Sequence, residues 1–271
     1  MAYELAIVGG GNMGTALLGG LLSGAGGELS DPSEIVVVEP SDTRRDAIAA
    51  DYPGVSVAPE PVTCRAAVIA VKPQYVPEVV TAAVAAGARR VLSIAAGVTT
   101  DAIAAAADAA APNGEPVSVL RAMPNTPALV GEGVSALAGA PGTPAADLDW
   151  AERVLTGVGL VVRVDESQLD AVTGLTGSGP AYVFLVAEAL IDGGVLAGLP
   201  RALAEPMVAQ LLVGSAKLLA ERGDPAALRA MVTSPGGTTA AGVRTLEERA
   251  VRSALIEAVA AAAARSRALG A

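Results

Sequence analysis

A glycine-rich segment near the start of the sequence has the spacing of a phosphate-binding loop. Gly9, Gly11 and Gly14 follow the apolar run 5–8, typical of a buried strand, and open the stretch 12–23, which has helical spacing. In that setting Gly9 permits a tight turn, Gly11 lets a pyrophosphate approach the backbone, and Gly14 lets the helix pack closely on the sheet. The free N–H groups of the helix start favour phosphate. The segment therefore predicts a dinucleotide-binding loop.

The residues after the next apolar run give two signals about the cofactor. Glu39 ends the run 35–38, where an acidic residue usually binds the adenosine ribose hydroxyls and favours NADH. Ser41, Arg44 and Arg45 follow closely, and an arginine there suits the 2′-phosphate of NADPH. The sequence leaves the preference open between NADPH and NADH.

A third apolar run, 67–71, ends at Val71 and is followed by Lys72 and a proline. In a doubly wound sheet, ligands bind beyond the carboxyl ends of the strands. Lys72 is therefore either a cofactor contact or an ordinary surface charge at a strand end.

The segment 233–241 has the composition of a helix start that could bind an anion. Ser234 is a candidate N-cap, and Pro235 suits the first helical turn. The next two glycines would expose backbone N–H groups to a carboxylate, and the hydroxyl of Thr238 or Thr239 could reach a neighbouring polar atom. An ordinary capped helix with a glycine hinge is the alternative.

A similar segment, 177–182, also opens a helical stretch with glycines and a proline. Its glycines could serve an anion site or close helix packing, and the sequence does not separate the two.

Composition excludes several kinds of chemistry. The 271 residues contain no histidine and one cysteine, Cys64, so His-based acid–base catalysis, intrachain disulfides and Cys or His metal sites are excluded. The net charge of −10 and the lack of a basic face argue against nucleic acid as a partner. Charged residues interrupt the most apolar stretch, 182–199, and the N-terminus lacks a signal-peptide pattern. We therefore expect a cytoplasmic protein with no membrane partner.

The pattern of elements changes along the chain. Up to about residue 165, apolar strands alternate with helices, which predicts an α/β fold with a Rossmann-type doubly wound parallel sheet. Strands are also expected at 91–94, with shorter ones at 117–120 and 134–137. Beyond that point only helical spacing remains, in the stretches 181–196, 201–222 and 246–269. We expect a dinucleotide-binding domain at 1–165 and a helical domain at 166–271.

Five motifs, in this order, make the chain resemble the pyrroline-5-carboxylate reductase family over nearly its whole length. They are Gly9-Gly10-Gly11-Asn12-Met13-Gly14, Ala70-Val71-Lys72-Pro73-Gln74, Met123-Pro124-Asn125-Thr126-Pro127, the stretch from Ala171 to Tyr182, and Ser234-Pro235-Gly236-Gly237-Thr238-Thr239. The last two are far more specific than a dinucleotide fingerprint.

The resemblance implies a reaction and an assembly. Members transfer hydride from NAD(P)H to the C=N carbon of 1-pyrroline-5-carboxylate and form L-proline. They join a Rossmann domain to an all-helical C-terminal domain through which dimers form, and dimers often assemble further into rings such as decamers. A small-molecule substrate and a homo-oligomer are thus expected. The imine nitrogen becomes basic as hydride arrives, so a hydroxyl or water can supply its proton without histidine.

The resemblance also implies roles for individual residues. The nicotinamide side of the site is expected to include Lys72, Ala95 and Asn125. The substrate carboxylate is expected on Ser234, Gly237, Thr238 and Thr239, with the Thr239 hydroxyl bonded to the ring nitrogen as the catalytic contact. Glu166 matches an acidic residue near the substrate. Met231 departs from the family, because some members carry a cofactor-contacting Asn there.

Two other functions are weighed against this one. A β-hydroxyacid dehydrogenase also joins a Rossmann domain to helices, but it uses a lysine after a glycine-rich helix start, where this chain carries Glu188. A nucleotide-sensing module without catalysis would not need the intact segment 234–239.

Overall fold

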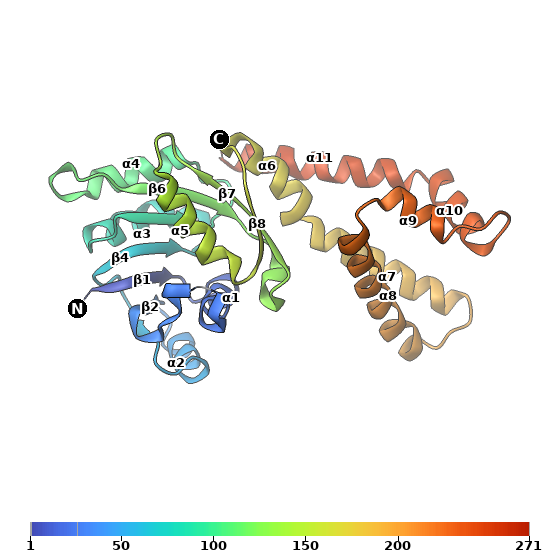
Figure 1. Cartoon of the computed structure of the whole chain (residues 1–271), viewed down its shortest axis with the longest axis horizontal. Coiled ribbons are helices and arrows are strands. Elements are labelled where there is room, and N and C mark those ends of the chain that lie inside the picture. Colours follow the sequence, from blue (N-terminus) through green and yellow to red (C-terminus); the bar gives the residue numbers. More distant parts are fainter. Residues whose placement is uncertain (1, 26, 271) are drawn as a thin grey trace. The chain divides into compact units, whose positions relative to one another are not determined.

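The computed structural model describes residues 2–25 and 27–270. By their internal contacts these residues form two compact units. The first comprises the described parts of 1–178 and 261–271, and the second comprises 179–260. The first unit carries a sheet, and the second is helical (Figure 1).

Within the described residues, eight strands of the first unit form one sheet in the order β3-β2-β1-β4-β5-β6-β7-β8. The strands are β1 Tyr3–Val8, β2 Ile35–Val38, β3 Ser56–Ala58, β4 Cys64–Ile69, β5 Arg90–Ser93, β6 Ser118–Met123, β7 Gly133–Gly139 and β8 Gly159–Arg163. From β1 the chain builds outward through β2 and β3, then returns to β4 on the other side of β1. This reversal creates the crevice in which doubly wound sheets bind ligands.

Helices cover both faces of this sheet (Figure 1). They include α1 Asn12–Gly20, α2 Asp42–Asp51, α3 Val76–Ala85, α4 Thr100–Ala110 and α5 Ala145–Thr156. In β1, Leu5 and Ile7 pack in the same core cluster as residues of α1, α2 and α5, while Ala6 and Val8 pack with α3 and α4. Both faces of the strand are buried, which explains its continuous apolar run.

The expected α/β class is confirmed, with differences at one end of the sheet. β7 runs antiparallel to β6, and both are longer than the short strands expected there. β3 and β8 were not predicted. Both are strands at the two ends of the sheet order, and neither contains a fully buried residue, so their sequences lack the apolar run that marks the central strands.

The second unit is built from long helices. They are α7 Gly179–Leu196, α8 Arg201–Arg222, α9 Pro225–Met231, α10 Thr238–Glu248 and the first half of α11 Val251–Gly270. Asp224 caps α9 by accepting bonds from Ala226 N and Ala227 N. The stretch 246–269, expected as one helix, is interrupted at Ala250, whose φ of 55° lies in the left-handed region.

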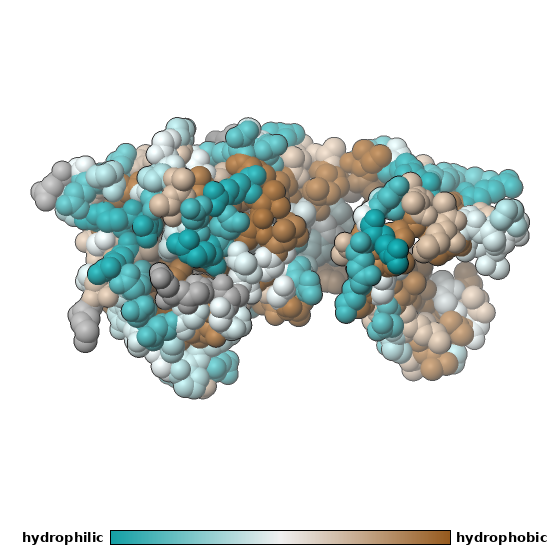
Figure 2. All heavy atoms as spheres, viewed as in Figure 1, coloured by the Kyte–Doolittle hydropathy of each residue, from teal (hydrophilic) through white to brown (hydrophobic). Residues whose placement is uncertain are grey.

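This second unit has almost no apolar core of its own. Of its described residues, only Ala204 and Val208 are buried hydrophobics. Figure 2 shows apolar side chains at the surface of α7 and α8. Two helical stretches, Glu166–Leu196 and Arg201–Arg222, are long and apolar enough to cross a membrane by length and composition alone. Exposed apolar surface on this scale requires a covering partner. The large hydrophobic residues exposed on this unit include Val183, Phe184, Leu185, Leu203, Met207, Leu211 and Ile256.

We expect self-association to cover this surface. At nanomolar concentration the protein should sediment as an oligomer, and Phe184→Glu should shift it to a smaller species, because a carboxylate at the contact would lose its water. Val130→Glu, at an exposed apolar residue of the first unit, is the matched control and should not change sedimentation. A wild-type monomer in sedimentation velocity would contradict the expectation.

Candidate active site

The residues expected to bind the cofactor follow the carboxyl ends of neighbouring strands. β2, β1, β4, β5 and β6 are mutually parallel, so their carboxyl ends meet at one edge of the sheet. In that order the edge carries Glu39, the glycine loop, Val71, Ala95 and Asn125. The expected cofactor residues are thereby brought together along one line in the first unit.

The glycine loop combines tight packing with one open position. Gly9 has a φ of +112°, and a Cβ there would lie 2.4 Å from the Ala70 carbonyl oxygen. A Cβ on Gly14 would lie 2.0 Å from the Gly9 oxygen. At Gly11, the N-cap of α1, a Cβ would meet nothing within 4 Å. The space left at Gly11 is a cradle that fits a pyrophosphate at the start of α1.

The first residues of α1 complete this cradle. Asn12 is exposed at the helix start, while Met13 packs against the core below it. The hydroxyl of Thr15 donates to the carbonyls of Gly11 and Asn12. The first N–H groups of the helix have no carbonyl one turn earlier, so they are available to an anion.

Glu39 is buried and holds the loop from behind. Its carboxylate accepts hydrogen bonds from Gly10 N and Ser41 N, both at 3.0 Å. The Arg44 guanidinium lies 3.6 Å from the same carboxylate, with 63% of its side chain exposed. Arg45 instead donates to the Glu39 carbonyl at 2.7 Å and pairs with Asp42. Arg44 is thus the arginine of this pair with an accessible charge.

Ser41 occupies the N-cap position of α2, but its side chain makes no capping bond there. Ser41 instead contributes its backbone N–H, which donates a hydrogen bond to the Glu39 carboxylate.

The carboxyl ends of β4, the middle strand of this edge, and of β5 are neighbours. Val71 is half-buried, and Lys72 is exposed at the start of a short turn, Pro73–Tyr75. Ala95 is buried, and its N–H donates to the Ser93 hydroxyl at 3.3 Å. The Lys72 side chain can reach an anionic ligand, whereas Ala95 offers only backbone and a methyl surface.

Asn125 is buried, and both ends of its side-chain amide are engaged. Its Nδ2 donates to the Thr176 carbonyl at 3.0 Å, and its Oδ1 accepts from Val134 N at 2.8 Å. Thr176 belongs to a π-helical turn, Thr173–Gly177, and such turns are frequent at functional sites. Asn125 therefore ties the end of β6 to β7 and to this turn, a contact that the sequence did not predict.

One of the glycines in the segment 177–182 is closely packed. A Cβ on Gly177 would lie 2.8 Å from the Met123 terminal methyl carbon, whereas a Cβ on Gly179 would meet nothing within 4 Å. The Met123 methyl carbon is the end of a flexible side chain that can move aside, so this contact alone does not require glycine at position 177.

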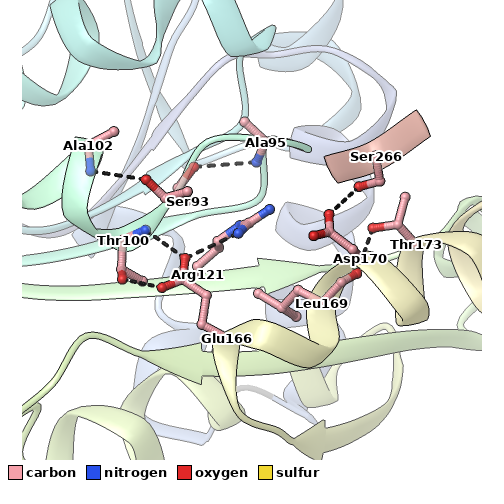
Figure 3. A network of polar contacts seen from close by, with 11 residues as sticks. Ser93, Ala95, Thr100, Ala102, Arg121, Glu166, Leu169, Asp170, Thr173 and Ser266 are labelled. Atoms are coloured by element: carbon pink, nitrogen blue, oxygen red, sulfur yellow. Dashed lines mark hydrogen bonds and ion pairs between the residues drawn. The ribbon is translucent and has the colours of Figure 1, made fainter. Parts of the chain in front are cut away.

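Glu166 is bound by two residues that no motif in the sequence marks, Thr100 and Arg121 (Figure 3). Its carboxylate accepts from Thr100 N at 2.7 Å, from the Thr100 hydroxyl, and from Arg121 at 3.1 Å. Arg121 could have been noticed as the one charged residue of the strand Ser118–Met123. Thr100 gives no such signal, because it resembles any helix-start threonine.

The surroundings of Glu166 keep its carboxyl group ionised. Burial raises its pKa, but the hydrogen bonds from Thr100 and the charge of Arg121 outweigh burial, and the net pKa is lowered. A lowered pKa contributes stability above the pKa of an unfolded glutamate, about 4.3, and that stability is lost as pH falls through the folded value.

The start of α10 differs from the sequence expectation. Ser234 does not cap the helix and Pro235 is not in its first turn, because α10 begins at Thr238 with Gly237 at the N-cap position. Gly236 has a φ of 69°, and Gly237 N donates to the Ser234 carbonyl at 3.0 Å. This left-handed turn delays the helix by three residues. It leaves the N–H groups of Thr238 and Thr239 at the helix start, where an anion can accept them.

The expected site residues therefore fall into two groups, in different units. The cofactor residues and Glu166 belong to the first unit, while Ser234, Gly237, Thr238 and Thr239 form one turn of the second. The described residues contain no group of His, Cys, Asp and Glu able to hold a metal ion.

Comparison with known proteins gives consistent matches. The sequence profile described as pyrroline-5-carboxylate reductase dimerisation matches residues 166–269, and one described as NADP oxidoreductase coenzyme F420-dependent matches 4–97. The chain is 45% identical to pyrroline-5-carboxylate reductase of Synechocystis over 278 residues, covering 100% of this chain and 99% of that one.

Solved structures agree with these matches. A pyrroline-5-carboxylate reductase from Coxiella burnetii is 31% identical, with a TM-score of 0.88 and full coverage of both chains. Pyrroline carboxylate reductase of Plasmodium falciparum, solved with NADP bound, is 27% identical with a TM-score of 0.81, covering 99% of this chain and 98% of that one. The carboxyl edge of the sheet has the features of a dinucleotide site, the helical unit lacks a core of its own, and relatives that match over their full length share one activity. The chain therefore belongs to the pyrroline-5-carboxylate reductase family, whose NAD(P)H-dependent oxidoreductases reduce the C=N bond of 1-pyrroline-5-carboxylate to form L-proline.

Proposed function

We propose that this reductase holds NADPH along the carboxyl edge of its sheet and 1-pyrroline-5-carboxylate at the start of α10. The observation that carries the proposal is the alignment of the glycine loop, Glu39, Lys72, Ala95 and Asn125 along one edge. The bound cofactor supplies the hydride. The experiment is NADPH oxidation by the purified protein with 1-pyrroline-5-carboxylate, followed by absorbance. If adding the substrate causes no oxidation of NADPH, the proposal is overturned.

The pyrophosphate fits the open position at Gly11, with Gly9 and Gly14 shaping the loop and Asn12 and Met13 supplying its first helical N–H groups. Ser41 and Arg44 bind the adenosine 2′-phosphate, because 63% of the Arg44 side chain is exposed but only 17% of the Arg45 side chain. Glu39 supports the glycine loop by accepting a hydrogen bond from Gly10 N, and it lies next to the adenosine ribose. The Plasmodium relative with NADP bound supports the choice of NADPH.

The substrate carboxylate rests on the N–H groups of Thr238 and Thr239, with Ser234 and Gly237 shaping the turn beneath it. This position brings the Thr239 hydroxyl to the ring nitrogen. A hydroxyl that can donate stabilises the nitrogen as it gains electron density from the arriving hydride. Holding the imine and the nicotinamide in near-attack geometry can contribute about 7–11 kcal/mol.

The assembly follows from the exposed helices. The protein is a homo-oligomer, and we propose that its helical domain, 166–271, forms a dimer in which α7 and α8 cover one another's apolar surfaces. Further association into rings such as decamers would use the same domain. This arrangement assigns the two candidate membrane helices to protein contacts and supports a cytoplasmic protein with no membrane partner.

Gly11→Val tests the cradle. The added side chain enters open space, so the melting temperature should stay near wild type, while NADPH binding measured by calorimetry should be lost. Gly14→Val is the contrast, because its Cβ would collide with the Gly9 carbonyl, and that variant should lose stability. Unchanged NADPH affinity in Gly11→Val would remove this loop from the cofactor site.

Arg44→Ala tests the cofactor choice. A charge-assisted contact to the 2′-phosphate is worth about 1.5–3 kcal/mol, so NADPH should bind about tenfold or more weakly while NADH binding is spared. Arg45→Ala serves as the comparison, since its charge is paired with Asp42. Equal losses for both cofactors in Arg44→Ala would mean that Glu39 determines the ribose site.

Thr239→Val tests the proton contact. The substitution keeps shape and removes the hydroxyl, so kcat should fall about 10–100-fold, or about 1.4–2.7 kcal/mol, with a smaller change in KM. Thr239→Ser should retain most activity. Proline-like inhibitors should still bind the Val variant, because backbone groups hold the carboxylate. An unaffected kcat would make Thr239 an ordinary helix residue.

A further inference from the structure

The backbone beneath Glu166 is fixed by its neighbours. Glu166 opens a short 3₁₀ turn, Glu166–Gln168, and Asp165 and Gln168 close a reciprocal capping box around that turn. In this box Asp165 N donates to the Gln168 side-chain oxygen at 2.9 Å. Two hydrogen-bonded partners at its base leave the Glu166 side chain little freedom, so it approaches α4 from a rigid support.

The Glu166 carboxylate reaches the beginning of α4. Thr100 is the first residue of that helix and is only 1% exposed, and both its N–H and its hydroxyl donate to Glu166. A carboxylate at a helix N-terminus is favoured by the helix dipole and by the free N–H groups. The third donor is Arg121 of β6, whose side chain is 7% exposed. With three donors on its two oxygens, the carboxylate is occupied within the first unit.

Three contacts hold the loop between β5 and α4, residues 94–99, and in one of them Gly97 packs against Leu269 and Gly270 at the end of α11. At the strand end, Ile94 N donates to the Ile69 carbonyl at 3.1 Å and Ala95 N donates to the Ser93 hydroxyl. At the helix end, Thr100 is held by Glu166. Ala95 lies within this loop, on the edge assigned above to the nicotinamide. Loss of the Glu166 contact would free the helix end of the loop, while the contacts at the strand end and at Gly97 would remain.

Arg121 makes the anchor depend on charge as well as on hydrogen bonds. The backbone of Arg121 is paired in register with Ser93, the last residue of β5, and its guanidinium donates to Glu166, so the contact starts from the strand next to the one that leads into the loop. Neutralising Glu166 would leave a buried guanidinium without its anionic partner, which is costly. An ionised, fully engaged carboxylate is also a poor proton donor, and this argues against Glu166 as the acid of the reaction.

We propose that Glu166 is a positioning residue: through Thr100 and Arg121 it fixes the loop 94–99 on the nicotinamide side of the cofactor cleft, and it does not contact the substrate. This rests on the proposed placement of the nicotinamide beside Ala95.

Glu166→Gln and Thr100→Val test the proposal from both ends of one contact. Each should lower kcat about tenfold, because a slightly misplaced cofactor loses near-attack geometry, while KM for 1-pyrroline-5-carboxylate changes less than about twofold. The double variant should be no worse than the more damaged single variant, because both remove the same anchor. Thr100→Ser keeps the hydroxyl and should restore the wild-type kcat.

Thr143→Val is the matched control. It removes another part-buried hydrogen bond of the first unit, from the Thr143 hydroxyl to the Ala140 carbonyl at 2.7 Å, in the connection between β7 and α5 and away from the loop. It should lower the melting temperature and leave kcat unchanged.

Two results would overturn the proposal. One is a rise of about tenfold or more in substrate KM for Glu166→Gln, which is the behaviour of a direct substrate ligand. The other is a wild-type kcat in folded Thr100→Val, and this variant carries the test if Glu166→Gln does not fold. These results can be told apart from a failure of the proposed function, because in that case the wild-type protein itself would be inactive.

Discussion

The turn after β1 lies so close to the end of β4 that no side chain fits between them. A Cβ at Gly9 would collide with the Ala70 carbonyl, and one at Gly14 would collide with Gly9 itself. The start of α1 is thereby drawn down onto the sheet, and its free N–H groups meet the edge where five parallel strands end. The buried Glu39 carboxylate then fixes the loop through Gly10 and Ser41. The cofactor edge depends on this close packing, because a loop held further out would leave those N–H groups pointing into water.

The sequence predicted the centre of the sheet far better than its ends. The strand Ile35–Val38 was expected with the bounds it has, because a strand buried on both faces needs an uninterrupted apolar run. β8 escaped notice because Leu160 and Val162 are exposed at the end of the sheet, so burial imposes no pattern there. The direction of β7 was also beyond prediction, since strand direction follows from the short connection through 126–130 and leaves no mark on strand composition.

The site shows the same division between local and distant constraints. The glycine loop could be predicted because its requirements are local: φ, free space and a helix start. The contacts of Glu166 with Thr100 and of Asn125 with Thr176 could not, because these partners lie 66 and 51 residues away in the sequence. The start of α10 was misplaced for another reason. Ser234 and Pro235 form a valid capping pattern, but the left-handed Gly236 turns the chain once more before the helix begins.

The first unit is not one continuous stretch of chain, and this has a consequence for its biosynthesis. Residues 261–270, including the buried Ser266 that bonds to Asp170, are translated after the whole of the second unit. The nascent sheet can form its strand pairs early, since all eight strands precede residue 164. The contacts of Ser266 with Asp170 and of Gly270 with Gly97 must wait for α11 to leave the ribosome. During that interval the apolar helices of the second unit are already exposed, so chaperone binding would be concentrated on the helices rather than on the sheet.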